Sequence, residues 1–160
     1  MMRVGIGYDI HRLTEGRRLV LGGVEIPSVV GLDGHSDADV LLHAIIDALL
    51  GAVGAPDVGE QFPPSDPAYA NISSVALLER VQALVASRGF AIQNVDATIV
   101  AETPKLSPFK AAMVANIQSA LRLGDGQVSV KAKTNEMLDS VGRREGIAAF
   151  AVALVQERQG

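Results

Sequence analysis

The sequence lacks cysteine and tryptophan, and aromatic residues make up only 4% of its 160 residues. Without cysteine, disulfide bonds and thiolate metal ligands are excluded, so a metal site must use histidine, aspartate or glutamate. Because aromatic side chains are scarce, we expect a core built from valine, isoleucine, leucine and alanine.

Long apolar runs and clusters of positive charge are also missing. No run of about 18 apolar residues is present, which argues against a membrane-spanning helix. The opening MMRVGIGYDIHR turns polar too early for a signal peptide. The net charge of -4 and the lack of a Lys/Arg run argue against a nucleic-acid partner. We therefore expect a soluble cytoplasmic protein without a membrane partner, folded as one domain over residues 1–160.

The hydrophobic pattern predicts an α+β domain. Strands are expected at residues 3–9, 18–26, 90–100, 128–134 and 147–156. Helices are expected at residues 38–53, 73–88 and 107–124, with Ser36 or Asp37 as the N-cap of the first. Residues 54–69 hold four of the seven prolines and are expected to form an irregular loop. A loop of this length inside a domain suggests a functional role.

Three residues form a candidate metal site. Asp9 and His11 are two apart in or just past an expected strand, so their side chains leave the same face. Asp39, His43 and Asp47 form one stripe on the first expected helix. Asp9, His11 and His43 would give zinc three protein ligands and leave one position open, while Asp39 or Asp47 could orient the His43 ring. The spacing alone leaves open a solvated strand end and a salt-bridged helix face.

Six motifs resemble, in order, those of the 2-C-methyl-D-erythritol 2,4-cyclodiphosphate synthase family. They are GYDIHR at 7–12, GHSDADV at 34–40 with His43-Ala44, DVG at 57–59, FPPSD at 62–66, AETPKL at 101–106, and Lys131-Ala132 with Thr134, Glu136 and Gly142-Arg143. Each motif alone is unspecific, and a residue such as Lys105 could simply be solvated. Six in the family's order are far more specific.

The resemblance implies a fold and a reaction. The fold would be a single α+β domain with a mixed sheet, helices on one face, and assembly as a homotrimer with sites between subunits. The reaction would convert 4-diphosphocytidyl-2-C-methyl-D-erythritol 2-phosphate to the 2,4-cyclodiphosphate with release of CMP, in non-mevalonate isoprenoid synthesis. Zinc would be held by Asp9, His11 and His43, and magnesium or manganese by Glu136.

The resemblance also implies roles for the remaining motif residues. His35 and Thr134 occupy the family's transition-state-stabilising positions. The methylerythritol phosphate part of the substrate would contact Ser36, Asp57, Gly59, Phe62, Ser65 and Asp66. The other expected substrate contacts are Ala101, Pro104, Lys105 and Leu106 in a cytidine pocket from a neighbouring subunit, with Thr134, Glu136 and Arg143.

The sequence departs from the family pattern at one place. Asp139 and Ser140 stand where the family more usually has glycine and phenylalanine, close to a trimer-axis cavity that can hold isoprenoid diphosphates, whereas Arg143 is retained. Apart from this departure, two rival functions stay open. A zinc-dependent phosphohydrolase would release inorganic phosphate or a linear product, and a non-catalytic isoprenoid diphosphate-binding trimer would bind without turnover.

Overall fold

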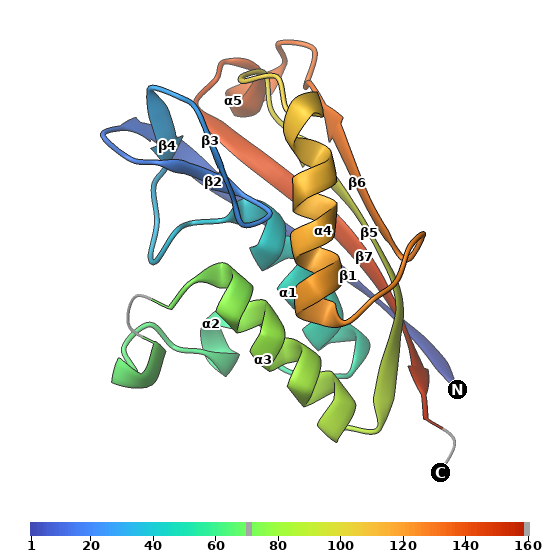
Figure 1. The fold of residues 1–160 in the computed structure, drawn as a ribbon. Helices are drawn as coiled ribbons and strands as arrows, with labels where there is room; N and C mark the ends of the chain where they lie inside the picture. The colour runs from blue at the N-terminus through green and yellow to red at the C-terminus, as the bar shows by residue number, and fades with distance from the viewer. Residues whose placement is uncertain (70–71, 159–160) are drawn as a thin grey trace.

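A five-stranded mixed sheet organises the molecule, and the computed structural model describes residues 1–69 and 72–158 (Figure 1). The strand order is β4 (Val30–Leu32), β1 (Met2–Glu15), β7 (Gly146–Glu157), β5 (Phe90–Val100) and β6 (Val128–Lys133). β5 and β6 run parallel, and the other neighbouring pairs are antiparallel. The expected α+β class with a mixed sheet is confirmed.

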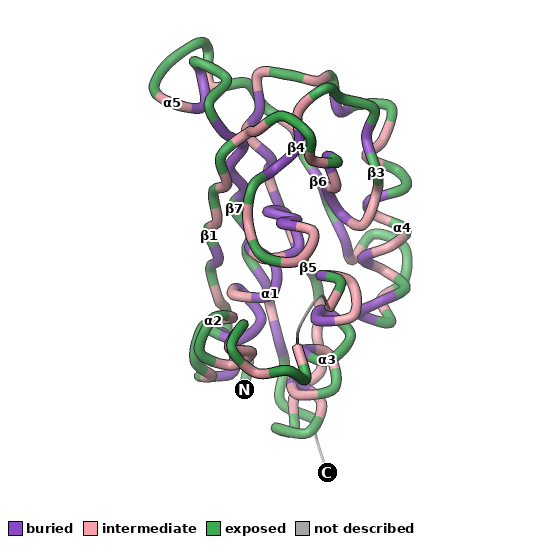
Figure 2. Tube along the Cα trace, turned by 90° about the vertical axis from the view of Figure 1, so that its left-hand side faces the viewer, coloured by how far each residue is buried: buried purple, intermediate pink, exposed green. Residues whose placement is uncertain are grey.

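Three helices cover one face of this sheet: α1 (Val40–Ala52), α3 (Ser74–Ser87) and α4 (Lys110–Leu121) (Figure 1). Short helices α2 (Val58–Gln61) and α5 (Asp139–Gly142), 3-10 turns at Pro67–Tyr69 and Ser107–Phe109, and a hairpin of β2 (Leu19–Leu21) and β3 (Val24–Ile26) complete the described chain. Ten of the 13 residues of α1 are buried, as expected for a helix that is apolar on nearly every side (Figure 2).

α1 lies unusually close to β1 because small residues meet along their contact. A Cβ atom at Gly7 would lie 1.8 Å from the carbonyl oxygen of Ala44, and one at Gly5 would lie 1.9 Å from that of Ala48. No side chain fits at such distances, so glycine is required on the strand. Since Asp9 follows Gly7 on the same face and His43 precedes Ala44, this close packing brings strand and helix ligands together.

Several expected boundaries differ from the structure. α1 is capped by Asp39, whose side chain accepts from the backbone N–H of Leu42, and not by Ser36 or Asp37. Ser36 and Ala38 adopt positive φ angles of 56° and 51°, so the chain turns sharply just before the helix begins. Residues 54–69 are less irregular than expected because they contain α2 and a 3-10 turn. The sequence pattern also missed β4 and α5, which are only three and four residues long.

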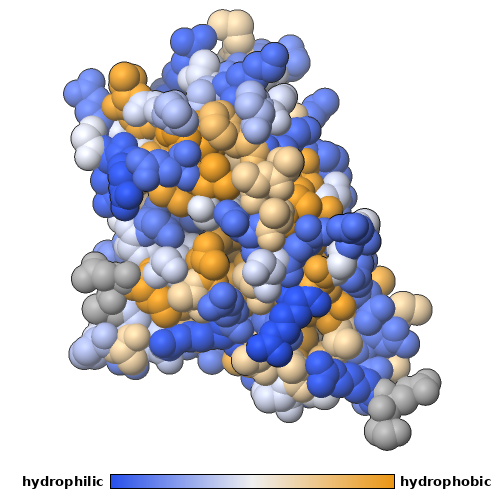
Figure 3. Space-filling model, viewed as in Figure 1, coloured by the Kyte–Doolittle hydropathy of each residue, from blue (hydrophilic) through white to orange (hydrophobic). Residues whose placement is uncertain are grey.

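The other face of the sheet exposes a band of apolar side chains. On β1 the even-numbered residues point away from α1, and Val4 and Ile6 are 66% and 74% exposed. The remaining members of this exposed apolar face are Met2, Tyr8, Ile10, Phe150 and Val152. On the helix-bearing side, in contrast, hydrophilic side chains interrupt the hydrophobic ones (Figure 3). Among the described residues, no helix is long and apolar enough to cross a membrane.

Candidate metal and substrate site

Asp9, His11 and His43 converge at the junction of β1 and α1. One oxygen of Asp9, Oδ2, lies 3.0 Å from His11 Nε2 and 3.1 Å from His43 Nδ1. All three potential ligand atoms lie within 4.8 Å of one another, and each residue is partly buried. The two imidazole rings meet edge to face with their centroids 5.6 Å apart. The structure thus brings together the three residues that the sequence suggested as zinc ligands.

The tautomer of His11 shows that this cluster fits a cation. His11 Nδ1 lies 2.8 Å from the carbonyl oxygen of Asp33, which only accepts, so Nδ1 carries the proton. In the neutral ring the lone pair is therefore on Nε2, the atom that faces Asp9. This nitrogen is buried and has no partner of hydrogen-bonding geometry among the described residues. A lone pair that faces a carboxylate in this way fits a bound metal ion.

The close approach of Asp9 to the two histidines also determines the pKa values of the cluster. Burial alone would raise the pKa of Asp9, but the nearby rings of His11 and His43 lower it to about 2. The pKa of His11 is raised, chiefly by its interaction with Asp9. Asp9 is consequently ionised at neutral pH, which is the form that binds a cation.

The two aspartates expected to orient His43 have other partners. Asp39 is fully buried and accepts from the backbone N–H groups of Gly22, Gly23 and Leu42. Asp47 accepts from the backbone N–H of Val58 at 2.8 Å. The expectation that either would orient the His43 ring is therefore wrong. The β2–β3 turn supplies backbone partners for Asp39, and the start of α2 supplies the partner for Asp47. Helical spacing alone cannot reveal these tertiary contacts.

The residue that contacts the far side of the His43 ring was missed by sequence reasoning. Ser74 Oγ lies 3.0 Å from His43 Nε2 and donates to Asp37. Burial alone would raise the pKa of Asp37, but hydrogen bonds from the side chain and backbone of Ser74 lower it. The available sequence signal was a serine pair at a helix start, which predicts only capping.

A cavity of about 190 Å³ opens beside the metal cluster. Its lining includes His11 and His43, the expected catalytic residue His35, and the expected substrate contacts Ser36, Gly59 and Phe62. Apolar side chains from Phe62, Ile72 and Leu77 form much of its wall. Such a site can hold a small ligand with an apolar part beside a cation.

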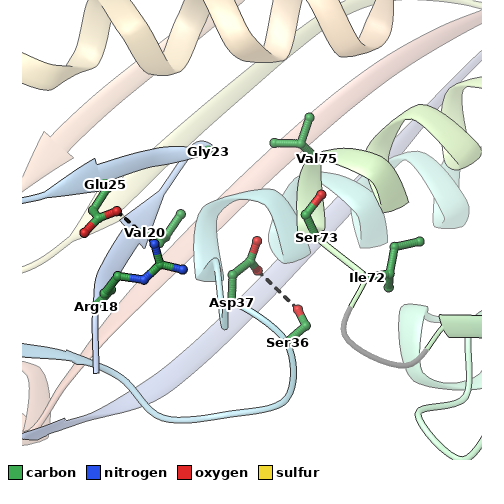
Figure 4. A pocket seen from close by; sticks show the side chains of 9 residues that line it. All are labelled: Arg18, Val20, Gly23, Glu25, Ser36, Asp37, Ile72, Ser73 and Val75. Carbon is green, nitrogen blue, oxygen red and sulfur yellow. Dashed lines mark hydrogen bonds and ion pairs between the residues drawn. The ribbon is translucent and has the colours of Figure 1, made fainter. Parts of the chain in front are cut away.

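The remaining residues expected on this side have local structural roles. Asp57 caps α2 by accepting from the backbone N–H of Glu60, and Asp66 accepts from that of Ala68 in the following turn. Ser65 is exposed just before this turn. A separate pocket of about 440 Å³ lies beyond Ser36 and is lined by Asp37, Ser73 and the Arg18–Glu25 ion pair (Figure 4).

The other expected site residues lie on the segments that follow β5, β6 and α5. Ala101, Pro104, Lys105 and Leu106 follow β5, and Thr134 and Glu136 follow β6. Glu102 links these segments because its side chain accepts from the backbone N–H groups of Asn135 and Met137. Arg143 is exposed after α5 and pairs with Glu145.

One chain therefore does not unite the two groups of expected site residues. β6 is three strands away from β1, a separation of about 14 Å across the sheet. Within the described chain, β7 and β5 separate the strand that carries Asp9 and His11 from the strand that precedes the Thr134–Glu136 segment. Within its own segment, Thr134 Oγ1 donates a hydrogen bond to the Glu136 carboxylate at 3.3 Å.

Comparison with known proteins identifies relatives along nearly the whole chain. The model of the YgbB family matches residues 2–156. A 2-C-methyl-D-erythritol 2,4-cyclodiphosphate synthase from Symbiobacterium thermophilum is 57% identical, over 98% of this chain and all of the relative. One from Agathobacter rectalis is 55% identical, over 94% of this chain and 85% of the relative.

Solved structures share the fold. The bifunctional IspDF of Campylobacter jejuni superposes with a TM-score of 0.93 and 40% identity; the match covers 98% of this chain but 42% of that longer protein. The IspF of Plasmodium falciparum, solved as a CDP complex, gives a TM-score of 0.86 and 35% identity over 99% of this chain and 97% of its own. By sequence and by fold, this chain belongs to the YgbB family, whose relatives matched here are 2-C-methyl-D-erythritol 2,4-cyclodiphosphate synthases.

Proposed function

We propose that this chain converts 4-diphosphocytidyl-2-C-methyl-D-erythritol 2-phosphate to 2-C-methyl-D-erythritol 2,4-cyclodiphosphate and CMP. The observation that carries the proposal is the convergence of Asp9, His11 and His43 beside the 190 Å³ cavity, in a chain that matches the family over residues 2–156. Relatives solved with CDP support a cytidine nucleotide as part of the substrate.

The cavity is assigned to the methylerythritol phosphate part of the substrate. Phe62 and Ile72 offer an apolar wall for the carbon skeleton, and Gly59 lets a ligand approach the backbone. His35 and Ser36 bring polar donors to the same cavity. Ser65, Asp57 and Asp66 complete the proposed contacts from the neighbouring loop.

Asp9, His11 and His43 are the proposed zinc ligands, and Glu136 is the proposed carboxylate for magnesium or manganese. Bound cations would neutralise phosphate charge and act as Lewis acids at a phosphoryl oxygen. Within the protein, Asp33 holds the His11 ring in place through its carbonyl oxygen. His35 and Thr134 are proposed to stabilise the negative charge that develops in the transition state.

We further propose a homotrimer, in which each site combines half-sites from two chains. The Ala101, Pro104, Lys105 and Leu106 segment would bind cytidine beside the metal cluster of a neighbouring copy, with Thr134, Glu136 and Arg143 close to the phosphates. Two observations support this: the half-sites lie three strands apart in one chain, and the exposed apolar face spans β1 and β7. An apolar patch of this kind marks an interaction surface.

The bond changes need no water. An oxygen of the substrate's 2-phosphate attacks the β-phosphorus, a new P–O–P bond forms, and the bond from that phosphorus to CMP breaks. The attacking oxygen is already anionic at neutral pH, so the protein needs mainly to hold it in line with the leaving group. CMP departs with the bridging oxygen.

Isotope labelling tests this proposal against hydrolysis. The reaction is run in oxygen-18 water, and both products are weighed by mass spectrometry. Unlabelled CMP and unlabelled cyclic diphosphate are the expected result. Label in either product above background, or release of a linear product, would instead identify a phosphohydrolase. Binding of substrate with no CMP release would contradict catalysis altogether.

A further inference from the structure

A hydrogen-bonded chain runs from the metal cluster to the start of α3. His43 Nδ1 faces Asp9, and on the opposite side of the ring Nε2 lies 3.0 Å from Ser74 Oγ. Ser74 is fully buried and its hydroxyl also contacts Asp37 Oδ1, while Asp37 Oδ2 accepts from the Ser74 backbone N–H at 3.0 Å. Figure 4 shows Asp37 on the loop before α1, between Ser36 and the first turn of α3.

The direction of each hydrogen bond follows from the available protons. An ionised carboxylate only accepts, so the single hydroxyl proton of Ser74 is donated to Asp37. Ser74 Oγ then has only lone pairs left for His43. The contact with His43 therefore requires a proton on Nε2, and the neutral ring keeps its lone pair on Nδ1.

We propose that Ser74 and Asp37 are positioning residues that hold His43 with its Nδ1 lone pair aimed at the metal site. The outer partner of a histidine ligand commonly determines which ring nitrogen is free to bind metal. Here the effect is relayed through a hydroxyl, so a residue that does not touch the ring also determines its tautomer. This inference rests on the metal-binding part of the proposed function.

A simpler role is that Ser74 and Asp37 only stabilise the start of α3. The variant Asp37→Asn separates the two roles because it reverses the direction of the hydrogen bonds that join residue 37, Ser74 and His43. An asparagine whose oxygen keeps the 3.0 Å contact with the Ser74 backbone N–H presents its NH₂ group to Ser74 Oγ. This orientation gives up the longer contact, 3.3 Å, that Asp37 Oδ1 accepts from the Asp39 backbone N–H. The Ser74 hydroxyl proton must then point to His43 Nε2, which moves the ring proton to Nδ1, the atom that should bind metal.

Zinc affinity and the tautomer are measured without substrate. Zinc affinity is determined by chelator competition for the wild type, Asp37→Asn, Ser74→Ala and the control Ser73→Ala. Ser73 is the adjacent N-cap, which accepts from the backbone N–H of Ala76 and makes no contact with His43 among the hydrogen bonds of the described residues. Nitrogen-15 spectra of the metal-free proteins, at a pH where the ring is neutral, report which nitrogen of His43 carries the proton.

We expect zinc affinity to fall about 10- to 100-fold in Ser74→Ala and at least as far in Asp37→Asn. Ser73→Ala should lower the melting temperature but leave zinc affinity unchanged. The wild type should show the proton on Nε2, and Asp37→Asn should show it on Nδ1. A wild-type proton on Nδ1, or equal zinc affinity in all four folded proteins, would overturn the inference. If the wild type binds no zinc, the metal part of the proposed function fails, and the nitrogen-15 spectra still decide the relay independently.

Discussion

Asp9 connects both histidines of the candidate metal site through a single carboxylate oxygen. In the metal-free protein, the two histidines stabilise the ionised form of Asp9, and Asp9 stabilises the protonated form of His11. This explains why the pKa of Asp9 falls to about 2 while the pKa of His11 rises from its ordinary value of 6.5. The same residues should therefore respond to pH in opposite ways with and without metal.

The metal-free protein should lose the stabilisation from this cluster at both ends of the pH range. Asp9 contributes above its unfolded pKa of 3.8, and that contribution is lost as the pH falls toward 2. His11 contributes below 6.5, and its contribution is lost as the pH rises through its raised pKa. The melting temperature of the metal-free wild type minus that of metal-free Asp9→Asn should thus be larger near pH 5.5 than near pH 8.5.

Stabilisation by zinc should depend on pH in the opposite direction. Zinc competes with protons for His11, so the rise in melting temperature on adding zinc should grow from about pH 5.5 to about pH 8. A zinc effect that is independent of pH would argue that His11 is not a ligand.

At the scale of elements, the metal site depends on how closely α1 approaches β1. Gly7 faces Ala44 across this contact with no room for a side chain, and His43 is the residue just before Ala44 on the helix. The position of His43 relative to Asp9 and His11 therefore depends on how closely α1 packs against β1.

Gly7→Ala should destabilise the protein by at least about 1–3 kcal/mol, because α1 must move to admit the methyl group. Zinc affinity should fall in the fraction that folds, since His43 moves with α1. Gly51→Ala is the matched control: Gly51 lies on α1, is exposed, and a methyl group there would meet no atom within 4 Å outside its own stretch of the helix. It should stabilise the helix by about 0.5–1 kcal/mol and leave zinc affinity unchanged. Urea unfolding and chelator competition measure both quantities, and equal effects of the two changes would contradict the packing argument.

At the scale of the whole molecule, the exposed apolar face is the feature that a single chain leaves without a partner. Ile6 lies within this face on β1, whereas Val29 lies outside the sheet and is 90% exposed. Ile6→Lys should convert the proposed trimer to monomers because it places a charge in an apolar interface. Val29→Lys should leave the mass in solution unchanged. Light scattering after size exclusion measures the masses, and a trimeric Ile6→Lys protein would place the interface elsewhere.

Shared sites can be tested by mixing two inactive variants. His43→Ala removes a proposed zinc ligand, and Lys105→Ala alters the proposed cytidine pocket in the segment after β5. In mixed trimers some sites combine an intact metal half with an intact cytidine half, so CMP release should partly return. Mixed trimers verified by mass spectrometry that stay inactive would show that each site belongs to one chain.

Local patterns along the chain were enough to predict the main elements and the contiguous motifs. Strand alternation in β1 places Asp9 and His11 on one face, apolar spacing predicts α1 with His43, and the bounds of β5 are those expected. The family resemblance added the order of the motifs and the reaction. These features depend on local periodicity or on residues that are neighbours along the chain.

Which distant groups meet became visible only in the folded chain. Ser74, and not Asp39 or Asp47, contacts His43, because α3 packs its first turn beside the loop before α1. The metal cluster and the Thr134–Glu136 segment lie apart because β7 and β5 stand between β1 and β6. Neither fact follows from local spacing, since both depend on which surfaces pack together, and residues 31 apart such as His43 and Ser74 carry no periodic signal of their contact.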